Sequence, residues 1–282
     1  MRRATRVGLR LVLAVVAVYG LICIGMFGLQ RHLLYHPDSR DITMDVALVP
    51  GASVQTLLTP DGETLKAWWV EPASDTTPVY LYFQGNADTL ARRDERFAYL
   101  VADGAGLLAL SWRGFGGSTG SPTESRLKED GLLAYQWLRE RAEANRIIIF
   151  GESLGTGVGV WLSSQQPSAA LVLDSAYTSI ADAAKLLYPW LPVSQLLLDH
   201  YDSLDLAPSV HTPLLALHCQ QDPVIPFILG QQLFDAFPAS DKHLEVVPRR
   251  CHVPSIAPVA GLLRQLETKV SAQVVFDRLE AQ

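Results

Sequence analysis

The fold is decided by the stretch Ile147-Ile148-Ile149-Phe150-Gly151-Glu152-Ser153-Leu154-Gly155, in which an apolar run leads directly into the pattern G-x-S-x-G. The run predicts a buried strand, and the residues after the pattern predict a helix. A strand that turns this sharply into a helix leaves no room for side chains beside the turn, which explains the two flanking glycines. We therefore expect Ser153 on a nucleophile elbow, with its hydroxyl raised above the sheet beside a helix N-terminus.

A serine hydroxyl becomes a good nucleophile only when a base removes its proton, so a histidine is needed. The chain contains seven histidines. His252 differs from the others because it follows the predicted strand 244–247 through the short loop Pro-Arg-Arg-Cys. The last strand of a doubly wound sheet would deliver a base at this point.

The acid is expected between the serine and the histidine along the chain. Asp222 fits this order, because it follows the predicted strand 214–218 within a proline-containing loop. Asp174 is the alternative, because it follows the predicted strand 170–173. The loop and the distance from His252 favour Asp222, since they suit adjacent strands better.

A tetrahedral intermediate also needs hydrogen-bond donors for its oxyanion. The backbone N–H of Leu154, the residue after the nucleophile, supplies one. The second is expected from the loop after the predicted strand 79–83, which continues as Gln84-Gly85-Asn86-Ala87-Asp88. Asn86 is the expected donor, through its main chain, with Gly85 permitting close approach.

These residues carry a family resemblance that covers nearly everything after about residue 30. The chain resembles the α/β-hydrolases of the bud-emergence branch, membrane-anchored serine hydrolases related to protein-depalmitoylating enzymes. The matching motifs are Leu33-Leu34-Tyr35-His36-Pro37, Gln84-Gly85-Asn86-Ala87, Trp112-Arg113-Gly114-Phe115-Gly116-Gly117-Ser118-Thr119-Gly120, the elbow, Tyr201-Asp202-Ser203-Leu204 and Asp222-Pro223-Val224-Ile225-Pro226.

The resemblance implies Ser153, Asp222 and His252 as a catalytic triad, with Asn86 and Leu154 as the oxyanion pair. Three positions depart from the family pattern. They are Gln84, where the family usually has histidine, Cys219, where it usually has glycine, and Cys251, where a small residue precedes the catalytic histidine.

Composition agrees with one globular enzyme domain and an appendage. The chain has 282 residues, of which 49% are hydrophobic, so it can bury a large core. The net charge of −6 and the absence of a long basic run argue against a nucleic-acid partner. The sequence contains no P-loop, dinucleotide fingerprint or zinc-ligand spacing, and we expect neither a cofactor nor a metal.

The N-terminus indicates a membrane anchor. The segment 11–29 carries no charge and is long enough to cross a hydrocarbon core of about 30 Å. Four arginines precede it within residues 1–10, whereas two, Arg31 and Arg40, follow it. This bias predicts a cytoplasmic N-terminus and a periplasmic or otherwise extracytoplasmic catalytic domain. A cleaved signal peptide is the competing interpretation, but no convincing A-x-A site follows the apolar segment.

The remaining chain alternates strands and helices, as in a doubly wound, mostly parallel sheet. Strands are expected near 79–83, 106–111, 146–150, 170–174, 213–218 and 243–247, after a hairpin formed by 54–59 and 64–70. Helices are expected near 89–102, 123–142, 154–166 and 226–237. We divide the chain into an anchor, 1–30, and an α/β-hydrolase domain, 31–282. A small helical lid is expected at about 176–210, where an apolar segment is broken by prolines.

Together these features predict a single-pass, membrane-tethered serine hydrolase that cleaves an ester or thioester of an acyl or lipid-like substrate through an acyl-enzyme. The lid has an alternative interpretation, in which it only packs on the sheet. Two other functions stay open, a non-catalytic scaffold with this fold and a serine peptidase.

The cysteines yield one more expectation. Cys219 directly follows the strand that presents Asp222, and Cys251 directly precedes His252, so an acid–base contact draws the two cysteines together. Both a disulfide and two free thiols are compatible with this proximity, because a bond also needs suitable Cα distances and Cβ directions.

Overall fold

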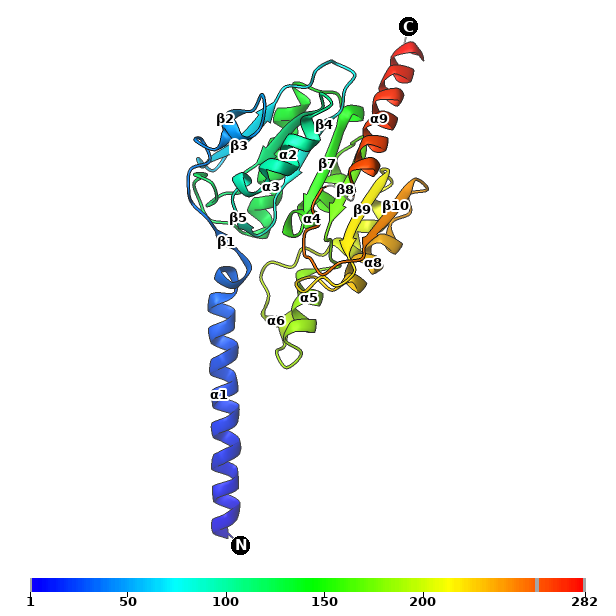
Figure 1. Ribbon diagram of the computed structural model, residues 1–282. Helices are drawn as coiled ribbons and strands as arrows, with labels where there is room; N and C mark the ends of the chain where they lie inside the picture. Colours follow the sequence, from blue (N-terminus) through cyan, green and yellow to red (C-terminus); the bar gives the residue numbers. More distant parts are fainter. Residues whose placement is uncertain (1, 257–258, 281–282) are drawn as a thin grey trace.

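An eight-stranded sheet forms the centre of the computed structural model, which describes residues 2–256 and 259–280 (Figure 1). The strands are β2 Ser53–Leu58, β3 Thr64–Val70, β4 Val79–Phe83, β6 Gly106–Leu110, β7 Ile147–Glu152, β8 Ala170–Asp174, β9 Leu214–Cys219 and β10 Lys242–Val247. Their spatial order is β10-β9-β8-β7-β4-β6-β3-β2. All neighbours from β6 to β10 are parallel, whereas β2 and β3 pair antiparallel. The predicted doubly wound sheet and its opening hairpin are confirmed.

Helices cover both faces of this sheet. Helices α3 Glu124–Arg139, α4 Leu154–Gln165 and α8 Phe227–Ala236 pack on one face, and α2 Asp94–Val101 and α9 Ala260–Glu280 pack on the other. Short 3-10 turns are η1 Val46–Leu48, η2 Leu90–Arg93, η3 Ala144–Arg146 and η4 Ala207–Ser209. Four of the five α-helices lie within the expected ranges. The C-terminal helix α9 has no counterpart among them.

Burial on both faces explains the continuous apolar runs of the central strands. In β4, Val79, Leu81 and Phe83 enter one hydrophobic core, and Tyr80 and Tyr82 enter the other. A strand with two buried faces cannot alternate apolar and polar residues. The polar groups that carry chemistry therefore lie beyond the carboxyl ends of the strands.

The glycine-rich loop 112–120 is held in place by Arg113. Its guanidinium donates to Asp130 over 2.8 Å and to Asp61 over 3.0 Å, and its side chain is buried. Gly114, Gly116, Gly117 and Gly120 all adopt positive φ, which other residues rarely tolerate. Arg113 thus anchors the loop.

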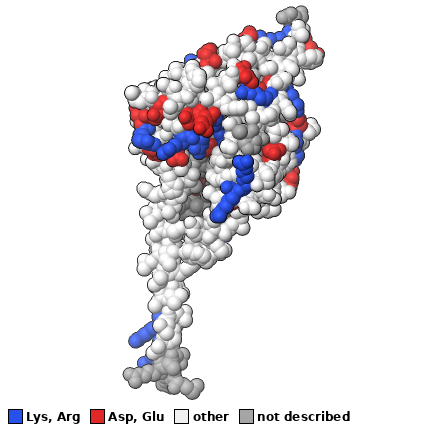
Figure 2. Space-filling model, viewed as in Figure 1, with Lys and Arg blue, Asp and Glu red and all other residues white. Residues whose placement is uncertain are grey.

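Helix α1, Arg2–Leu34, projects from the domain as a single long stem (Figure 1). Its part from Arg6 to Leu34 is long and apolar enough to cross a membrane. Figure 2 shows that charged side chains gather on the upper part of the face in view, whereas the stem is white from the blue arginines near its foot up to the adjoining lower end of the domain. Strand β1, His36–Pro37, follows the helix and pairs in parallel with β5, Ala87–Asp88.

The segment after β8 is helical and broken, as expected. It contains α5 Ile180–Leu187, α6 Val193–Leu196 and α7 Ser203–Leu206. We call residues 176–210 the lid, and the loop 188–192 between α5 and α6 the lid tip. Figure 1 shows α5 and α6 hanging below the sheet on the same side as α1.

Candidate active site

Ser153 lies between the end of β7 and the start of α4, in a strained backbone conformation with φ 49° and ψ −117°. The flanking glycines make this turn possible. A Cβ at Gly151 would lie 2.6 Å from the Thr156 backbone, and one at Gly155 would lie 2.2 Å from the Phe83 carbonyl oxygen. Strain of this kind persists only where surrounding structure enforces it. The predicted elbow is present.

His252 contacts both predicted partners. Its Nε2 lies 2.7 Å from Ser153 Oγ, and its Nδ1 lies 2.8 Å from Asp222 Oδ2. The other oxygen of Asp222 accepts the backbone N–H groups of Val224 at 2.8 Å and Ile225 at 2.9 Å. A carboxylate can only accept hydrogen bonds, so the proton on Nδ1 faces Asp222 and Nε2 is left to accept from the serine. We call Ser153, His252 and Asp222 the relay.

Asp174, the alternative acid, is engaged elsewhere. It is buried at the end of β8 and receives a hydrogen bond of 2.6 Å from Arg96. Burial raises the pKa of Asp174 to about 6, although Arg96 acts in the opposite direction. The structure therefore brings Asp222, and not Asp174, into contact with the histidine.

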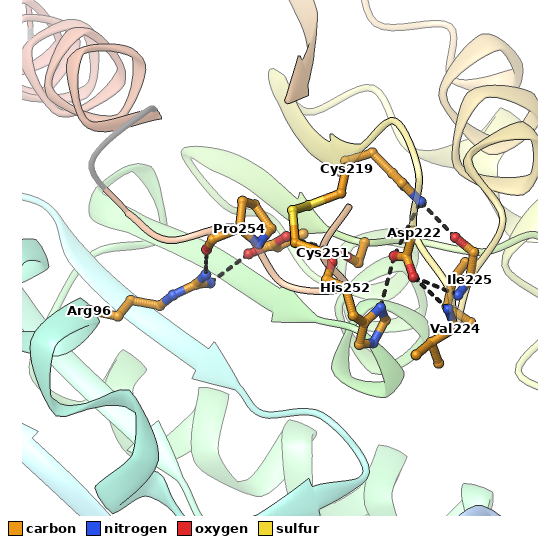
Figure 3. The surroundings of a disulfide bond; sticks show 11 residues. Arg96, Cys219, Asp222, Val224, Ile225, Cys251, His252 and Pro254 are labelled. Carbon is orange, nitrogen blue, oxygen red and sulfur yellow. Dashed lines mark hydrogen bonds and ion pairs between the residues drawn. A yellow bond between two sulfur atoms is a disulfide. The ribbon is translucent and has the colours of Figure 1, made fainter. Parts of the chain in front are cut away.

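A disulfide ties the loop of the acid to the loop of the base. Cys219 at the end of β9 is bonded to Cys251, with their Cα atoms 5.6 Å apart (Figure 3). Two main-chain bonds join the same loops, from the Gln220 N–H to Val247 and from the Gln221 N–H to Arg249. Of the two states that the sequence left open, the structure contains the bridge.

A buried ionic network lies behind the elbow, and sequence reasoning missed it. Glu152 is fully buried, and it accepts from Arg93 at 2.6 Å and from the Tyr82 hydroxyl. Arg96 lies 3.6 Å from it. Burial alone would raise the pKa of Glu152, but these donors lower it to about 2, so the carboxylate is charged.

The same network reaches the loop that carries the base. Arg96 donates to the Pro254 carbonyl over 2.7 Å (Figure 3). The Ser175 hydroxyl donates to the His252 carbonyl. Arg96 therefore links β8 to the main chain on the far side of His252. The sequence signal that could have revealed it is a pair of arginines three positions apart, Arg93 and Arg96, which lie on one side of the helical segment between β4 and β6.

His218 is a second histidine near the relay acid. Its Nε2 lies 3.0 Å from the Ile225 carbonyl oxygen and 3.6 Å from Asp222 Oδ2. Burial lowers its pKa, so the neutral ring donates to the carbonyl. His218 thus supports the loop that presents Asp222.

The expected oxyanion residues lie beside the nucleophile. Leu154 and Asn86 line the same cavity as Ser153. The Asn86 side chain donates to the Leu34 carbonyl over 2.6 Å, and its own carbonyl accepts from the His36 N–H over 2.8 Å. Asn86 is therefore fixed against the end of α1.

The residues before Asn86 shape the same loop. A Cβ added to Gly85 would lie 3.4 Å from Glu152 Oε1 and 3.5 Å from Ser153 Cβ, so this residue lies in van der Waals contact with the elbow. Gln84 accepts a hydrogen bond from the Trp112 indole over 2.9 Å through its carbonyl. Its buried side-chain amide has no partner within the described residues.

A cavity of about 340 Å³ opens in front of Ser153. This volume lies at the lower end of the range for small-molecule sites. Its walls are mainly apolar and come from the lid, the Asp222 loop and α1, and they include Leu187, Leu191, Ile225 and Met26. The described part of the chain has no group of three His, Cys, Asp or Glu side chains that could hold a metal.

Residues 79–209 match the family model for the alpha/beta hydrolase fold. Among solved structures, an esterase of Pyrococcus furiosus superposes with a TM-score of 0.66 at 17% identity, covering 84% of this chain and 97% of that one. At this identity the likeness concerns the fold alone.

Curated proteins similar in sequence include the following two. An uncharacterized protein of Mycobacterium tuberculosis is 37% identical over 84% of this chain and 86% of its own length. Lysophosphatidylserine lipase ABHD12 of Xenopus tropicalis is 34% identical over 64% of this chain. That match spans 53% of the lipase, about half of its length.

Proposed function

Because this chain belongs to the α/β-hydrolase superfamily, we propose that it is a membrane-tethered serine hydrolase that cleaves an ester or thioester of an acyl or lipid-like substrate. One observation carries the proposal. The Ser153 hydroxyl, His252 and Asp222 are joined by contacts of 2.7 and 2.8 Å at the end of a largely apolar cavity. An apolar cavity suits an acyl chain, and the relay suits acyl transfer.

The proposed reaction begins with attack of Ser153 Oγ on the substrate carbonyl carbon while His252 Nε2 takes the hydroxyl proton. The backbone N–H groups of Asn86 and Leu154 stabilise the oxyanion, and Asp222 stabilises the imidazolium. Collapse of the intermediate expels the alcohol or thiol, which receives the proton from His252. Water then attacks the acyl-enzyme by the same route, releasing the acid and regenerating the serine.

The membrane part of the proposal rests on α1. Residues 1–30 serve as a single-pass anchor with a cytoplasmic N-terminus, and residues 31–282 form the hydrolase domain with a lid at about 176–210. The excess of arginine before the apolar segment supports this orientation. The name of the relative ABHD12, a lysophosphatidylserine lipase, also supports a lipid-like substrate. Membership of the bud-emergence branch rests on the quoted motifs.

The test is activity-based labelling of the full chain. We expect a fluorophosphonate probe to label the parent, and we expect p-nitrophenyl esters to be hydrolysed. Ser153→Ala should abolish labelling and lower kcat by several powers of ten, because a triad acts as a unit. Its thermal unfolding should stay close to that of the parent, because removal of one hydroxyl leaves little cavity. Turnover by Ser153→Ala near the parent's rate would overturn the assignment, and an unlabelled, inactive parent would favour the scaffold alternative.

A further inference from the structure

The cavity in front of Ser153 is not built by the globular domain alone. Met26, Gln30, Leu33 and Leu34 of α1 line it together with the lid. The helix that the proposed function treats as a tether is thus part of the wall of the substrate site.

One face of α1 is committed to this contact. Tyr19, Cys23, Met26, Gln30 and Leu34 recur at intervals of three or four residues, so they share one face of the helix. Cys23, Met26, Gln30 and Leu34 are half-buried. By contrast, Leu21 and Ile24 are 67% and 69% exposed. The lid covers the face that includes Met26 and Gln30, and the face that includes Leu21 and Ile24 is free to contact lipid.

Polar bonds fasten this face to the lid. The Gln30 amide donates to the Leu196 carbonyl over 3.0 Å and accepts from the Leu198 N–H over 2.8 Å. Arg31 pairs with Asp199 at 2.9 Å. Gln30 therefore satisfies two backbone groups at the end of α6, and such groups are costly to leave unpaired in an apolar medium.

The lid tip reaches far down the helix. The Tyr19 hydroxyl donates to the Trp190 carbonyl over 2.9 Å. Tyr19 lies eight residues after Leu11 and ten before Leu29, which corresponds to about 12 and 15 Å along the helix. With residues 11–29 across the hydrocarbon, as in the proposed function, the lid tip lies near the middle of the bilayer.

The chemistry of the lid tip suits that depth. Tyr188 and Trp190 are 44% and 54% exposed, and the adjoining Leu187 at the end of α5 is 53% exposed, so the tip and its flank present apolar and aromatic surface. Pro189 and Pro192 have no backbone N–H, and the N–H groups at 188, 191 and 193 are bonded within the lid, whereas the N–H of Trp190 has no partner among the described residues. Because unpaired backbone groups are costly in lipid, pairing of the other donors favours immersion of the tip.

We propose that α1 forms a wall of the acyl-binding site, and that α1 and the lid tip together make a lipid-immersed passage along which one acyl chain of a membrane lipid reaches Ser153. Met26 is a specificity-determining residue, because it lies on the wall of this passage. The inference deepens the proposed function and rests on it.

The test uses the full chain in phosphatidylcholine nanodiscs and compares Met26→Trp with Ile24→Trp. Replacing Met26 by Trp adds a side-chain volume of about two methylene groups to the wall of the passage. We expect the ratio of kcat/KM for p-nitrophenyl palmitate to that for the butyrate to fall about tenfold. Ile24→Trp adds the same bulk on the exposed face and should leave the ratio unchanged. A ratio that Met26→Trp does not alter would overturn the proposal.

A second measurement does not require turnover. Palmitic acid with a terminal diazirine is photolysed with the Ser153→Ala chain, and the adducts are mapped by mass spectrometry. We expect adducts at or beside Met26 and fewer of them with Met26→Trp. Adducts confined to the lid or to lipid-exposed positions such as Ile24 would contradict the inference. Adducts at Met26 in a chain whose parent hydrolyses no ester would support the binding site and reject the proposed function.

Discussion

The relay end and the lid end of the cavity are held by different forces. At the relay end, the backbone of Ser153 is strained, a disulfide joins the loops of Asp222 and His252, and a buried ionic network lies behind them. At the lid end, short helices and proline turns present exposed apolar side chains, and a few polar bonds connect them to α1.

This difference suggests that the relay end carries out the reaction and that the lid end determines which acyl chains enter. Proton transfer requires donors and acceptors within hydrogen-bond distance, so the relay must be rigid. A passage for an acyl chain needs only apolar walls and must open to admit substrate. The comparison predicts large effects on kcat and stability at the relay end, and small effects on dynamics and chain-length preference at the lid end.

The largest expected effect concerns the acid of the relay. Asp222→Asn should lower kcat on a short soluble ester by about 10⁴, because an amide favours the wrong imidazole tautomer. Asp199→Asn changes the same group at the lid end, where it pairs with Arg31, and should lower kcat less than about tenfold. Steady-state kinetics on both variants make the measurement. A loss for Asp174→Asn that exceeds the loss for Asp222→Asn would move the acid to Asp174.

The next effect concerns the disulfide. The double change Cys219→Ser with Cys251→Ser should cost about 3–4 kcal/mol in the chain-entropy model and lower Tm by about 10 °C. Cys23→Ser, in α1, is the matched control and should leave Tm unchanged. Thiol titration of the denatured, non-reduced parent should find one reactive thiol. Three reactive thiols would refute the bridge.

Much of the relay end could be predicted from the sequence because its signals are local. The elbow needs glycines at fixed positions, and the acid and the base follow apolar strands, so Ser153, Asp222 and His252 were brought together as expected. The network of Glu152, Arg93 and Arg96 escaped, because ion pairing depends on which helix face meets the sheet edge.

The lid end was predictable only in outline. The apolar, proline-broken segment indicated short helices, and α5 and α6 are present. The contact between Gln30 and the lid joins residues more than 160 positions apart, and no sequence pattern near Gln30 predicts it. The expected boundary at residue 30 also falls inside a continuous helix, because α1 runs to Leu34.

A smaller expected effect concerns Asp174, whose carboxyl group at the relay end lowers the stability of the folded state as it loses its proton. Burial raises the pKa of Asp174 to about 6, above its unfolded value near 3.8. Between about pH 4 and pH 6 the folded state therefore keeps a proton that the unfolded state has released, and stability falls as pH rises. We expect the unfolding free energy of Asp174→Asn minus that of the parent, measured in urea, to increase from pH 4 to pH 6. Above about pH 6 this difference should stay constant. A difference in unfolding free energy that decreases from pH 4 to pH 6 would contradict the raised pKa.

The smallest effect concerns the contact at the lid tip. Tyr19→Phe removes the hydrogen bond to the Trp190 carbonyl while keeping the ring, and such bonds in membranes contribute about 0.6 kcal/mol. Opening of the lid should therefore become about threefold more frequent. Hydrogen exchange in nanodiscs should show faster exchange across 186–198 and unchanged exchange across the elbow, 147–160. Tyr188→Phe is the control, because that hydroxyl makes no hydrogen bond within the described residues. Equally faster exchange at the elbow would show that the relay end and the lid end open together. The proposed difference in rigidity between the two ends of the cavity would then be wrong.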